Sequence, residues 1–473
     1  MLDVRTRAMA RVNAMVARRQ EGRIAIIGAG FSGMAMAAAL IEAVDHRLHI
    51  VMIEGNAARA GGLAFGRAHA GELLNVRARD LGLLASHPGD FADWLAGFTS
   101  GGAPTRDDLA AAGERFAPRA AFSDYLRRRF DELVSRSPHV TVETVREEAI
   151  GIARRPGGGF RVDLVSGLGV SVEAVVLATG YGEAQGRFGR SPFAGIEAAE
   201  LENAGHIAIV GSGLSMVDTL LRLRAMGSRA EITVISRRGL MPQPHAPLSV
   251  RPPAWQVTEG VSLRVLYAEL RRAVARAEAE GRPWQGEINR LRPFAQDIWR
   301  TLSEADRSRF MRHLRRIWDA HRHRLPAGQH ARLMAEFDKP ETCHRAGRVV
   351  AARPGQPARL EVVWRGESVP ETLLADIVFD CSGHRPDMEA PLLRGLLREG
   401  LAVPDPLGIG LKVAPDGRVW VPDDDLSGLF AIGPLGQGSL FEITGVPEIL
   451  GQTARAAETL RDLVAMRAAV RTA

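Results

Sequence analysis

The chain contains the same strand, glycine turn and helix pattern twice, and this repetition limits the fold more than any other feature. The first copy is RIAIIGAGFSGMAMAAALIEA, followed by HIVMIEG; the second is HIAIVGSGLSMVDTLLRLRAMG, followed by EITVISRRG. Each unit later closes with paired strand-like segments and a small-residue turn, at Gly180 and at Gly383. Chance supplies one such glycine pattern more readily than two complete units. The sequence therefore predicts an α/β fold with two Rossmann-like dinucleotide-binding domains.

These landmarks predict where the parts of the chain begin and end. A predominantly helical, arginine-rich segment interrupts the second domain, and such insertions usually shape a substrate pocket. The expected divisions are an N-terminal extension over 1–20, the first part of one nucleotide domain over 21–200, the second nucleotide domain over 201–383 with its helical insertion at about 262–335, and the C-terminal part of the first domain over 384–473.

The first unit carries the complete dinucleotide fingerprint. Gly28 permits the tight turn, Gly30 lets a diphosphate approach the backbone, and Gly33 lets helix and strand pack closely. The helix N-terminus attracts the anion. Glu54 follows Gly33 by 21 residues, where a carboxylate accepts hydrogen bonds from a ribose diol and repels a 2′-phosphate. The residues assigned to this site are Gly28, Gly30, Phe31, Ser32, Gly33 and Glu54.

The second unit has a weaker fingerprint but a basic second strand. Met216 stands where the third glycine is expected. The second strand ends in a hydroxyl and two guanidinium groups, which suit the 2′-phosphate of NADPH and favour it over NADH. The alternative is that these arginines are solvated or paired with local acids. The residues assigned to this site are Gly211, Gly213, Leu214, Ser215, Ser236, Arg237 and Arg238.

Composition narrows the functional classes. The net charge is +6 and comes mostly from arginine, which suits anionic ligands. The arginines are scattered, so we expect no nucleic-acid partner. Cys343 and Cys381 are the two cysteines and have no paired spacing, which excludes CxxC redox chemistry and a zinc knuckle; we predict no metal site.

The location of the protein is predicted from what the sequence lacks. No apolar run reaches the roughly 18 residues that span a membrane, so we expect no membrane segment. The basic start lacks the apolar centre of a secretory signal, and a plain extension is favoured over a transit peptide or membrane-surface helix. The expected compartment is therefore the cytoplasm.

Taken together, these features resemble the two-dinucleotide-binding flavoproteins, which include flavin-containing and N-hydroxylating monooxygenases. More narrowly, GGLAFGRAHAGELLNVRARDLGLLASHPGDFADWL, FAPRAAFSDYLRR, SRRGLMPQPH and FDCSGHRPD resemble the bacterial FAD-NAD(P)-binding proteins. The resemblance implies FAD in the first domain and NADPH in the second, with the second domain inserted in the first.

The same resemblance implies further contacts with FAD. It places the ATG triplet beside FAD, a segment near residue 61 along the flavin, and the glycine loop from 433 to 438 near the flavin ring and pyrophosphate. Many relatives have an Asp where this chain has Pro434, so that polar contact must be absent or replaced. The residues carried over are Gly61, Gly62, Leu63, Asn75, Ala178, Thr179, Gly180, Gly433 and Pro434.

The expected activity is oxidation of NADPH by a bound flavin. The leading interpretation is a monooxygenase that acts through a flavin (hydro)peroxide on a nitrogen, sulfur or ketone centre, with a small-molecule substrate and dioxygen as partners. Two alternatives stay open: a flavin-dependent dehydrogenase or reductase without oxygen transfer, and a nucleotide-binding sensor or interaction protein. The substrate is not predicted, and a homo-oligomer is compatible with the sequence.

No catalytic residue follows from the sequence, but four polar residues are pocket candidates. His321 and His323 are two positions apart, which points them to different faces of a helix and favours surface or interdomain contacts over metal ligation. His245 follows a proline-rich turn, where a structural hydrogen bond and a ligand role are equally compatible. Arg119 lies inside the family-like motif FAPRAAFSDYLRR. Cys381 aligns with Ala178 and is expected to be a buried small residue.

Overall fold

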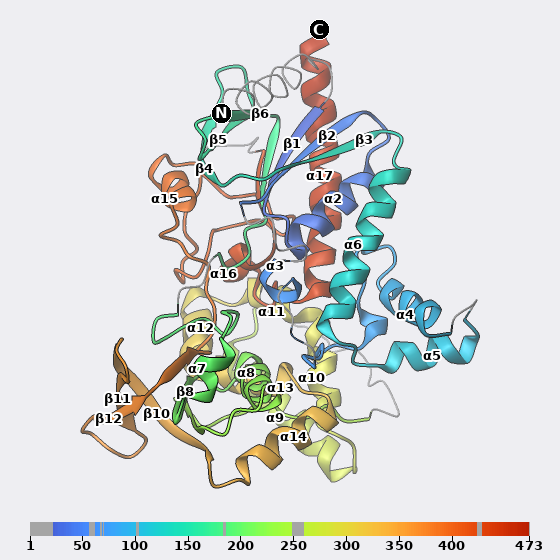
Figure 1. Ribbon diagram of the computed structural model, residues 1–473. Helices are drawn as coiled ribbons and strands as arrows, with labels where there is room; N and C mark the ends of the chain where they lie inside the picture. Colours follow the sequence, from blue (N-terminus) through green and yellow to red (C-terminus); the bar gives the residue numbers. More distant parts are fainter. Residues whose placement is uncertain are drawn as a thin grey trace.

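The computed structural model describes residues 22–55, 62–66, 69, 71–100, 104–182, 186–247, 260–422 and 428–472. The predicted N-terminal extension over 1–20 and the predicted flavin contact Gly61 lie outside these residues. Within the described part, the two nucleotide units form two separate sheets, which lie in the upper and lower halves of Figure 1.

The first unit is built on a five-stranded parallel sheet in the order β14-β7-β1-β2-β3. Its strands are β1 (Gly22–Ile27), β2 (Leu48–Ile53), β3 (Val140–Val145), β7 (Ala174–Leu177) and β14 (Leu429–Ala431). Every residue of β2 and β7 is buried, as expected for strands covered on both faces. β14 follows the whole second sheet in sequence yet pairs with β7, so the chain returns to complete the first sheet.

Side chains alternate between the two faces of this sheet. Ile24 and Ile26 pack toward the helices α2 (Phe31–Ala43) and α17 (Val446–Thr472), which lie side by side in Figure 1. Ala25 and Ile27 pack toward an antiparallel sheet of β4 (Ala149–Arg154), β5 (Phe160–Leu164) and β6 (Gly169–Val172). This period-two alternation is the reason that one short strand supplies two cores.

The second unit is a six-stranded sheet in the order β12-β11-β10-β9-β8-β13. Its strands are β8 (His206–Val210), β9 (Glu231–Ser236), β10 (Thr342–Arg353), β11 (Ala358–Trp364), β12 (Glu371–Ala375) and β13 (Ile377–Asp380). The start of β10 pairs in parallel with β9, and its remainder pairs antiparallel with β11. The parallel and antiparallel parts are therefore one sheet here, whereas the first unit keeps them separate. Helix α8 (Leu214–Ala225) follows β8 as α2 follows β1.

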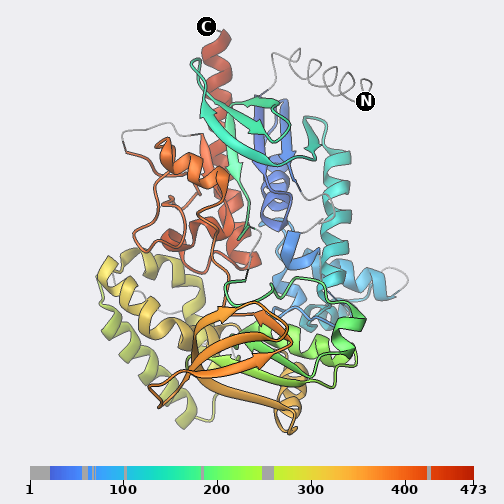
Figure 2. The ribbon, with the colours of Figure 1, turned by 60° about the vertical axis from the view of Figure 1, so that its left-hand side comes forward.

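A group of helices lies between β9 and β10 in sequence, where the helical insertion is predicted. They are α9 (Leu263–Ala279), α10 (Gln285–Leu291), η2 (Arg292–Phe294), α11 (Ala295–Thr301), α12 (Glu304–Arg309), the π-helical turn η3 (Phe310–Leu314), α13 (Arg315–Arg322) and α14 (Ala327–Phe337). In Figure 2 these yellow helices lie beside the orange and red C-terminal segment. Their core includes Ile288, Trp299 and Trp318, and it also takes in Phe441 from that C-terminal segment.

The remaining described helices and turns belong neither to the two sheets nor to the helical insertion. They are α3 (Gly62–Phe65), η1 (Ala78–Asp80), α4 (Asp90–Ser100), α5 (Arg106–Glu114), α6 (Arg119–Arg136), α7 (Ala198–Glu202), α15 (Pro391–Arg398), η4 (Gly433–Gly436) and α16 (Gln437–Leu440). None of the described helices combines the length and the apolar composition needed to cross a bilayer. The boundaries predicted near residues 200 and 383 stay predictions.

Candidate functional site

The turn after β1 has a shape that leaves room for a ligand in front of α2. Gly28 has φ +105°, and a Cβ there would lie 2.5 Å from the Ala178 carbonyl oxygen. A Cβ on Gly33 would lie 1.9 Å from the Gly28 oxygen, so both positions require glycine. Gly30 is different, because its φ of −72° suits any residue and its Cβ would meet nothing closer than Gly62 at 3.5 Å. Its missing side chain therefore leaves space rather than relieving strain.

Other predicted FAD contacts gather around this turn. The Ala29 N–H donates to Glu54 Oε2 at 2.9 Å, so the carboxylate at the end of β2 lies at the edge of the turn. Gly433 has φ +78°, and a Cβ there would lie 2.7 Å from Ser32 Oγ. Phe31 and Ser32 begin α2, Leu63 lies in α3 beside Gly62, and Thr179 and Gly180 follow β7. Segments far apart in sequence thus converge on one place, and their contact with a cofactor stays a prediction.

The loop that carries Pro434 is held by a residue that sequence analysis missed. The Gly433 N–H donates to Gln452 Oε1 at 2.9 Å, and Gln452 Nε2 donates to the Ala431 oxygen at 3.2 Å. Gln452 lies on α17 and is fully buried. A buried amide therefore fixes the backbone on both sides of Ile432, where the chain lacks the Asp that many relatives have after the glycine.

The turn after β8 repeats the first turn. Gly211 has φ +110°, and a Cβ there would lie 2.0 Å from the Cys381 oxygen, as Gly28 meets Ala178. A Cβ on Gly213 would meet nothing within 4 Å, so this turn is also open in front of its helix. Burial raises the pKa of the Cys381 thiol to about 12. Cys381 is thus the buried small residue that the alignment predicts, and it is not a thiolate nucleophile.

The departure at Met216 does not remove this turn. Met216 is fully buried in the core of the second unit. The Gly213 oxygen accepts from the Met216 N–H at 3.0 Å and from the Val217 N–H at 3.3 Å, and the second of these bonds matches the one from the Met34 N–H to the Gly30 oxygen. Leu214 and Ser215 form the first turn of α8. The second helix therefore keeps the first bond of the first helix, and its open end is retained.

The two helices that follow the glycine turns start without a capping side chain. No described side chain caps the N-terminus of α2 or α8, and neither helix has an acidic residue in its first turn. By contrast, α5 begins with a capping box in which Thr105 Oγ1 accepts from the Asp108 N–H, and α12 begins with a Ser303 cap. Uncapped starts leave backbone donors unpaired, which is the arrangement that binds a diphosphate.

The end of β9 presents the predicted phosphate-binding residues. Arg237 and Arg238 are exposed, and neither makes an ion pair with a described acid. Ser236 Oγ lies 2.8 Å from His344 Nε2 and accepts from the Gly239 N–H at 3.2 Å. The hydroxyl is therefore engaged in the loop, while the two guanidinium groups face solvent.

Arg119 does not face an open pocket. Its Nη2 lies 2.7 Å from Asp218 Oδ2, and the two side chains are 18% and 16% exposed. A second, longer pair joins Arg222 Nη1 to Glu72 Oε1 at 3.8 Å. Because Arg119 begins α6 while Asp218 and Arg222 lie on α8, these charges join the two nucleotide units. Burial nevertheless raises the pKa of Asp218 to about 6, against the effect of Arg119.

His245 also connects the two units. Its Nε2 lies 3.0 Å from the Asn75 carbonyl oxygen, and its ring lies 4.9 Å from that of Phe116. Burial lowers the pKa of His245 to about 4, so the neutral ring donates its N–H to this carbonyl. His245 thus hydrogen-bonds backbone, as one of its two sequence interpretations expects, but the backbone belongs to the segment predicted to follow the flavin.

The carboxyl ends of the two sheets meet at Tyr181 and His384. Tyr181 follows the ATG triplet after β7, His384 follows β13, and their ring centroids are 5.8 Å apart. The Asp387 backbone N–H donates to the Tyr181 backbone carbonyl oxygen at 3.3 Å. Parallel α/β sheets bind ligands at the carboxyl ends of their strands. The two open turns therefore belong to sheets whose ligand-binding edges adjoin.

The helical insertion holds a strained loop of the C-terminal segment. Phe441 and Glu442 have φ of +33° and +38°, which is unusual for residues other than glycine. Phe441 stacks on Trp299 at 4.7 Å, and Trp299 Nε1 donates to the Gly438 oxygen at 2.8 Å. Trp318 Nε1 donates to Glu442 Oε1 at 2.7 Å. Such backbone conformations persist where the surroundings enforce them, and they concentrate at functional sites.

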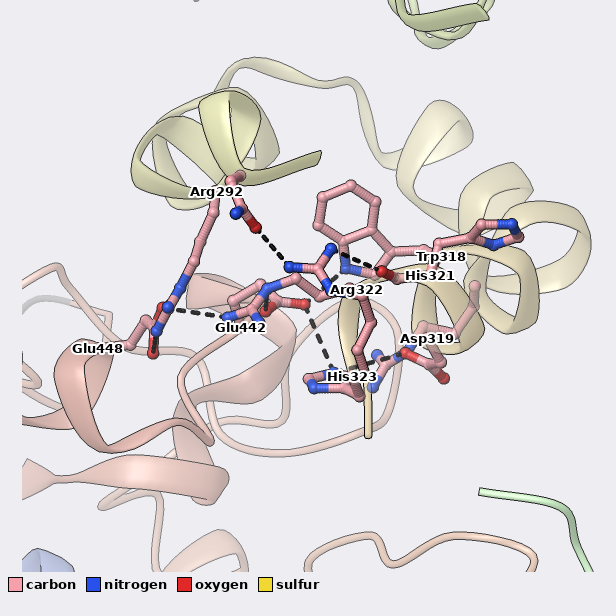
Figure 3. Close-up of polar contacts among 11 residues, drawn as sticks. Arg292, Trp318, Asp319, His321, Arg322, His323, Glu442 and Glu448 are labelled. Carbon is pink, nitrogen blue, oxygen red and sulfur yellow. Dashed lines mark hydrogen bonds and ion pairs between the residues drawn. The ribbon is translucent and has the colours of Figure 1, made fainter. Parts of the chain in front are cut away.

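Glu442 lies in a buried network of charges (Figure 3). Arg322 Nε lies 3.2 Å from Glu442 Oε2, and Arg322 Nη2 lies 3.5 Å from Glu448 Oε1. Arg292 Nε also pairs with Glu448, at 2.8 Å. Burial alone would raise the pKa of Glu442, but Arg322 and His323 outweigh it and lower that pKa. Glu442 is therefore a carboxylate in the folded protein.

The two histidine candidates take different directions, as Figure 3 shows. His321 Nδ1 lies 2.8 Å from the Ile317 oxygen, and its ring contacts Trp284, so it faces the helical insertion. His323 Nε2 lies 3.9 Å from Asp319 Oδ1 and 4.0 Å from Glu442 Oε1. Burial lowers the pKa of His323, and the nearby Glu442 carboxylate opposes this shift. Only His323 belongs to the network beside the strained loop.

Comparisons with known proteins agree with this architecture. Residues 25–182 match the family model described as FAD-NAD(P)-binding, so the resemblance in sequence is confirmed over the segment that contains the first open turn. A comparison with curated protein sequences finds no match.

Three solved structures are similar over nearly their whole length. The chain is 17% identical to the ornithine hydroxylase (PvdA) from Pseudomonas aeruginosa, with a TM-score of 0.59 over 94% of this chain and 99% of that one. It is also 17% identical to the ornithine N-hydroxylase KtzI from Kutzneria sp. 744, with a TM-score of 0.61 over 94% of this chain and 99% of that one. With the L-lysine 6-monooxygenase from Pseudomonas syringae it shares 17% identity and has a TM-score of 0.60, over 93% of this chain and 99% of that one. These likenesses confirm the predicted α/β fold with its two Rossmann-like sheets.

Proposed function

We propose that the protein is an FAD-dependent oxidoreductase that consumes NADPH, and that it is a monooxygenase acting on a nitrogen, sulfur or ketone centre of a small molecule. The observation that carries this proposal is the meeting of the two sheets at Tyr181 and His384. Each sheet has an open glycine turn, and the carboxyl edges adjoin, so two dinucleotides bound there would bring their reactive rings together.

The residues present fit both cofactors. Gly30 and Gly213 leave space in front of uncapped helices, which suits two diphosphates. Glu54 suits the ribose of FAD, and Arg237 with Arg238 suits the 2′-phosphate of NADPH. When bound, the flavin accepts a hydride from NADPH and supplies the reducing power for dioxygen activation.

Apolar packing beside the C-terminal loop supports oxygen transfer over simple reduction. Trp299 stacks on Phe441 of this loop, and Trp318 is buried in the same cluster. Exclusion of water protects reactive oxygen chemistry from wasteful side reactions. The similarity of the fold to ornithine and lysine hydroxylases supports a nitrogen centre as the first substrate class to test.

Oxygen consumption with matched product analysis tests this proposal. We expect the purified yellow protein to oxidise NADPH slowly alone, and to oxidise it faster with a panel of small amines, sulfides or ketones, one of which gains an oxygen atom from labelled dioxygen. NADPH oxidation that is fast with quinones and never labels a product would contradict oxygen transfer and leave a reductase. Protein that carries no flavin would contradict the enzyme proposal as a whole.

A further inference from the structure

Arg316 in the helical insertion reaches the ligand-binding edge of the second sheet. It lies on α13, and its Nη2 donates to the Ser382 carbonyl oxygen at 2.8 Å. A Cβ added at Gly383 would lie 3.9 Å from the same nitrogen. β13 ends at Asp380, and Ser382 and Gly383 are the second and third residues after it. A residue outside the Rossmann-like sheet is therefore held at the carboxyl end of one of its strands.

This position adjoins the second glycine turn. A Cβ on Gly211 would lie 2.0 Å from the Cys381 oxygen and 2.6 Å from the Ser382 nitrogen, so the segment that holds Arg316 packs against that turn. β13 and β8 are also neighbours in the sheet. The Arg316 guanidinium thus lies near the edge toward which the uncapped start of α8 is directed.

Arg316 has little compensating negative charge. Its nearest acid is Asp319, whose Oδ2 lies 3.9 Å away, but Oδ1 of the same carboxylate is 2.7 Å from Arg315 Nε. Burial lowers the pKa of Arg316; Asp319 opposes this shift, and the nearby cations Arg237, Arg315 and Arg385 add to it. The Arg316 side chain is 42% exposed, so the guanidinium is accessible from solvent. Cations gathered at one edge with few acids favour an anionic ligand.

We propose that Arg316 binds the diphosphate of NADP(H), so that the helical insertion completes the second nucleotide site. The inference rests on the proposed function, because it needs a nucleotide at the second turn. It gives Arg316 a role distinct from that of Arg237 and Arg238, which are assigned to the 2′-phosphate. A planar guanidinium suits paired contacts with phosphate oxygens.

This assignment links the nucleotide to the loop beside the flavin site. α13 carries Arg316 together with Trp318 and Arg322, which hold Glu442. A diphosphate that fixes Arg316 would therefore fix the same short helix that supports the strained loop at Phe441 and Glu442. Arg316 is a binding residue in this account and takes no part in the chemical step.

The test compares nucleotide affinities of the flavin-loaded protein by isothermal titration. For Arg316→Ala we expect the dissociation constants of NADP⁺, NAD⁺ and ADP-ribose all to rise by about tenfold, the size typical of a lost hydrogen bond to a charged group. Arg316→Lys should keep part of the affinity for all three. The matched control is Arg312→Ala, which removes the same charge from an exposed position one turn away and should leave the affinities unchanged.

The outcomes separate the two proposals. A loss confined to NADP⁺ would overturn the diphosphate assignment and place Arg316 with the 2′-phosphate residues. Unchanged affinity for all three nucleotides, in a variant that retains FAD and the wild-type melting temperature, would overturn any contact. Wild-type protein that binds none of the nucleotides would overturn the proposed function together with this inference.

Discussion

The two glycine turns share a backbone and differ in the charges around them. Gly28 and Gly211 have nearly the same φ, and a Cβ added at either position would clash with a backbone carbonyl just after the equivalent late strand. The second strand of one unit ends in Glu54, while that of the other ends in Arg237 and Arg238. The comparison teaches that steric fit specifies the shared diphosphate-binding turn, whereas side-chain charge at the strand end distinguishes which nucleotide is bound.

Removing the shared geometry should have the largest effect. Gly28→Ala would place a Cβ 2.5 Å from a backbone oxygen and force alanine to a positive φ, which costs about 1–3 kcal/mol before the clash is relieved. We expect the protein to lose FAD but to keep NADP⁺ binding, measured by flavin absorbance and titration. Gly211→Ala should do the reverse. Loss of both nucleotides from either variant would break the comparison.

Changing the distinguishing charges should weaken one nucleotide selectively. Arg237→Ala combined with Arg238→Ala removes two cations from the end of β9, and we expect the NADPH dissociation constant to rise about 10- to 100-fold with little change for NADH. Fluorescence titration measures both constants. The control is Arg229→Ala, an exposed arginine that precedes the other end of β9. Equal losses for NADPH and NADH would contradict the phosphate assignment.

The support given by the helical insertion can be tested at Trp318. Trp318→Phe keeps an aromatic side chain but removes the indole N–H that donates to Glu442 Oε1 at 2.7 Å. A buried carboxylate that loses a donor should lower the free energy of unfolding by about 2 kcal/mol, as measured by urea denaturation. Trp420→Phe, at a residue that is 44% exposed, is the control. A change equal to that of the control would show that the hydrogen bond contributes no stability.

The last prediction concerns the pH dependence of the contact between the two units. Burial raises the pKa of Asp218 to about 6, so between about pH 4 and 6 the folded protein holds a proton that the unfolded chain releases. This group therefore stabilises the fold below about pH 4, and its contribution is lost as the pH rises through 6. In Asp218→Asn we expect the decline across this window to be shallower by about 3 kcal/mol, since each pKa unit corresponds to about 1.4 kcal/mol. Urea denaturation measured at several pH values checks this difference.

An unchanged slope in Asp218→Asn would show that Asp218 does not titrate in that range. Glu200→Gln provides a control, since Glu200 pairs with Arg190 and not with a residue of α8. Its slope should match that of the wild type.

The sequence predicted the two turns because their signals are local. Glycines at fixed spacing after an apolar strand specify a turn whatever the rest of the chain does, and the turns at Gly28 and Gly211 have the expected geometry. The charged residues also lie at the ends of the second strands, as their positions in the sequence predicted, and Glu54 contacts the first turn.

The contacts between units could not be predicted in this way. Arg119 and Asp218 are 99 positions apart, and Trp318 and Glu442 are 124 apart, so no periodicity or spacing connects them. The positive φ of Phe441 and Glu442 has no sequence signal either, because neither residue is glycine. Arg119 was expected in a pocket because it lies in a family-like motif, but its guanidinium pairs with Asp218 of the other unit.

Anaerobic reduction of the bound flavin tests most directly whether the two open turns serve one reaction. NADPH carrying deuterium at the transferred position, mixed with the flavin-loaded protein, should bleach the flavin more slowly than unlabelled NADPH, because the hydride passes directly between adjoining rings. Flavin that stays oxidised while NADPH is demonstrably bound would contradict the account.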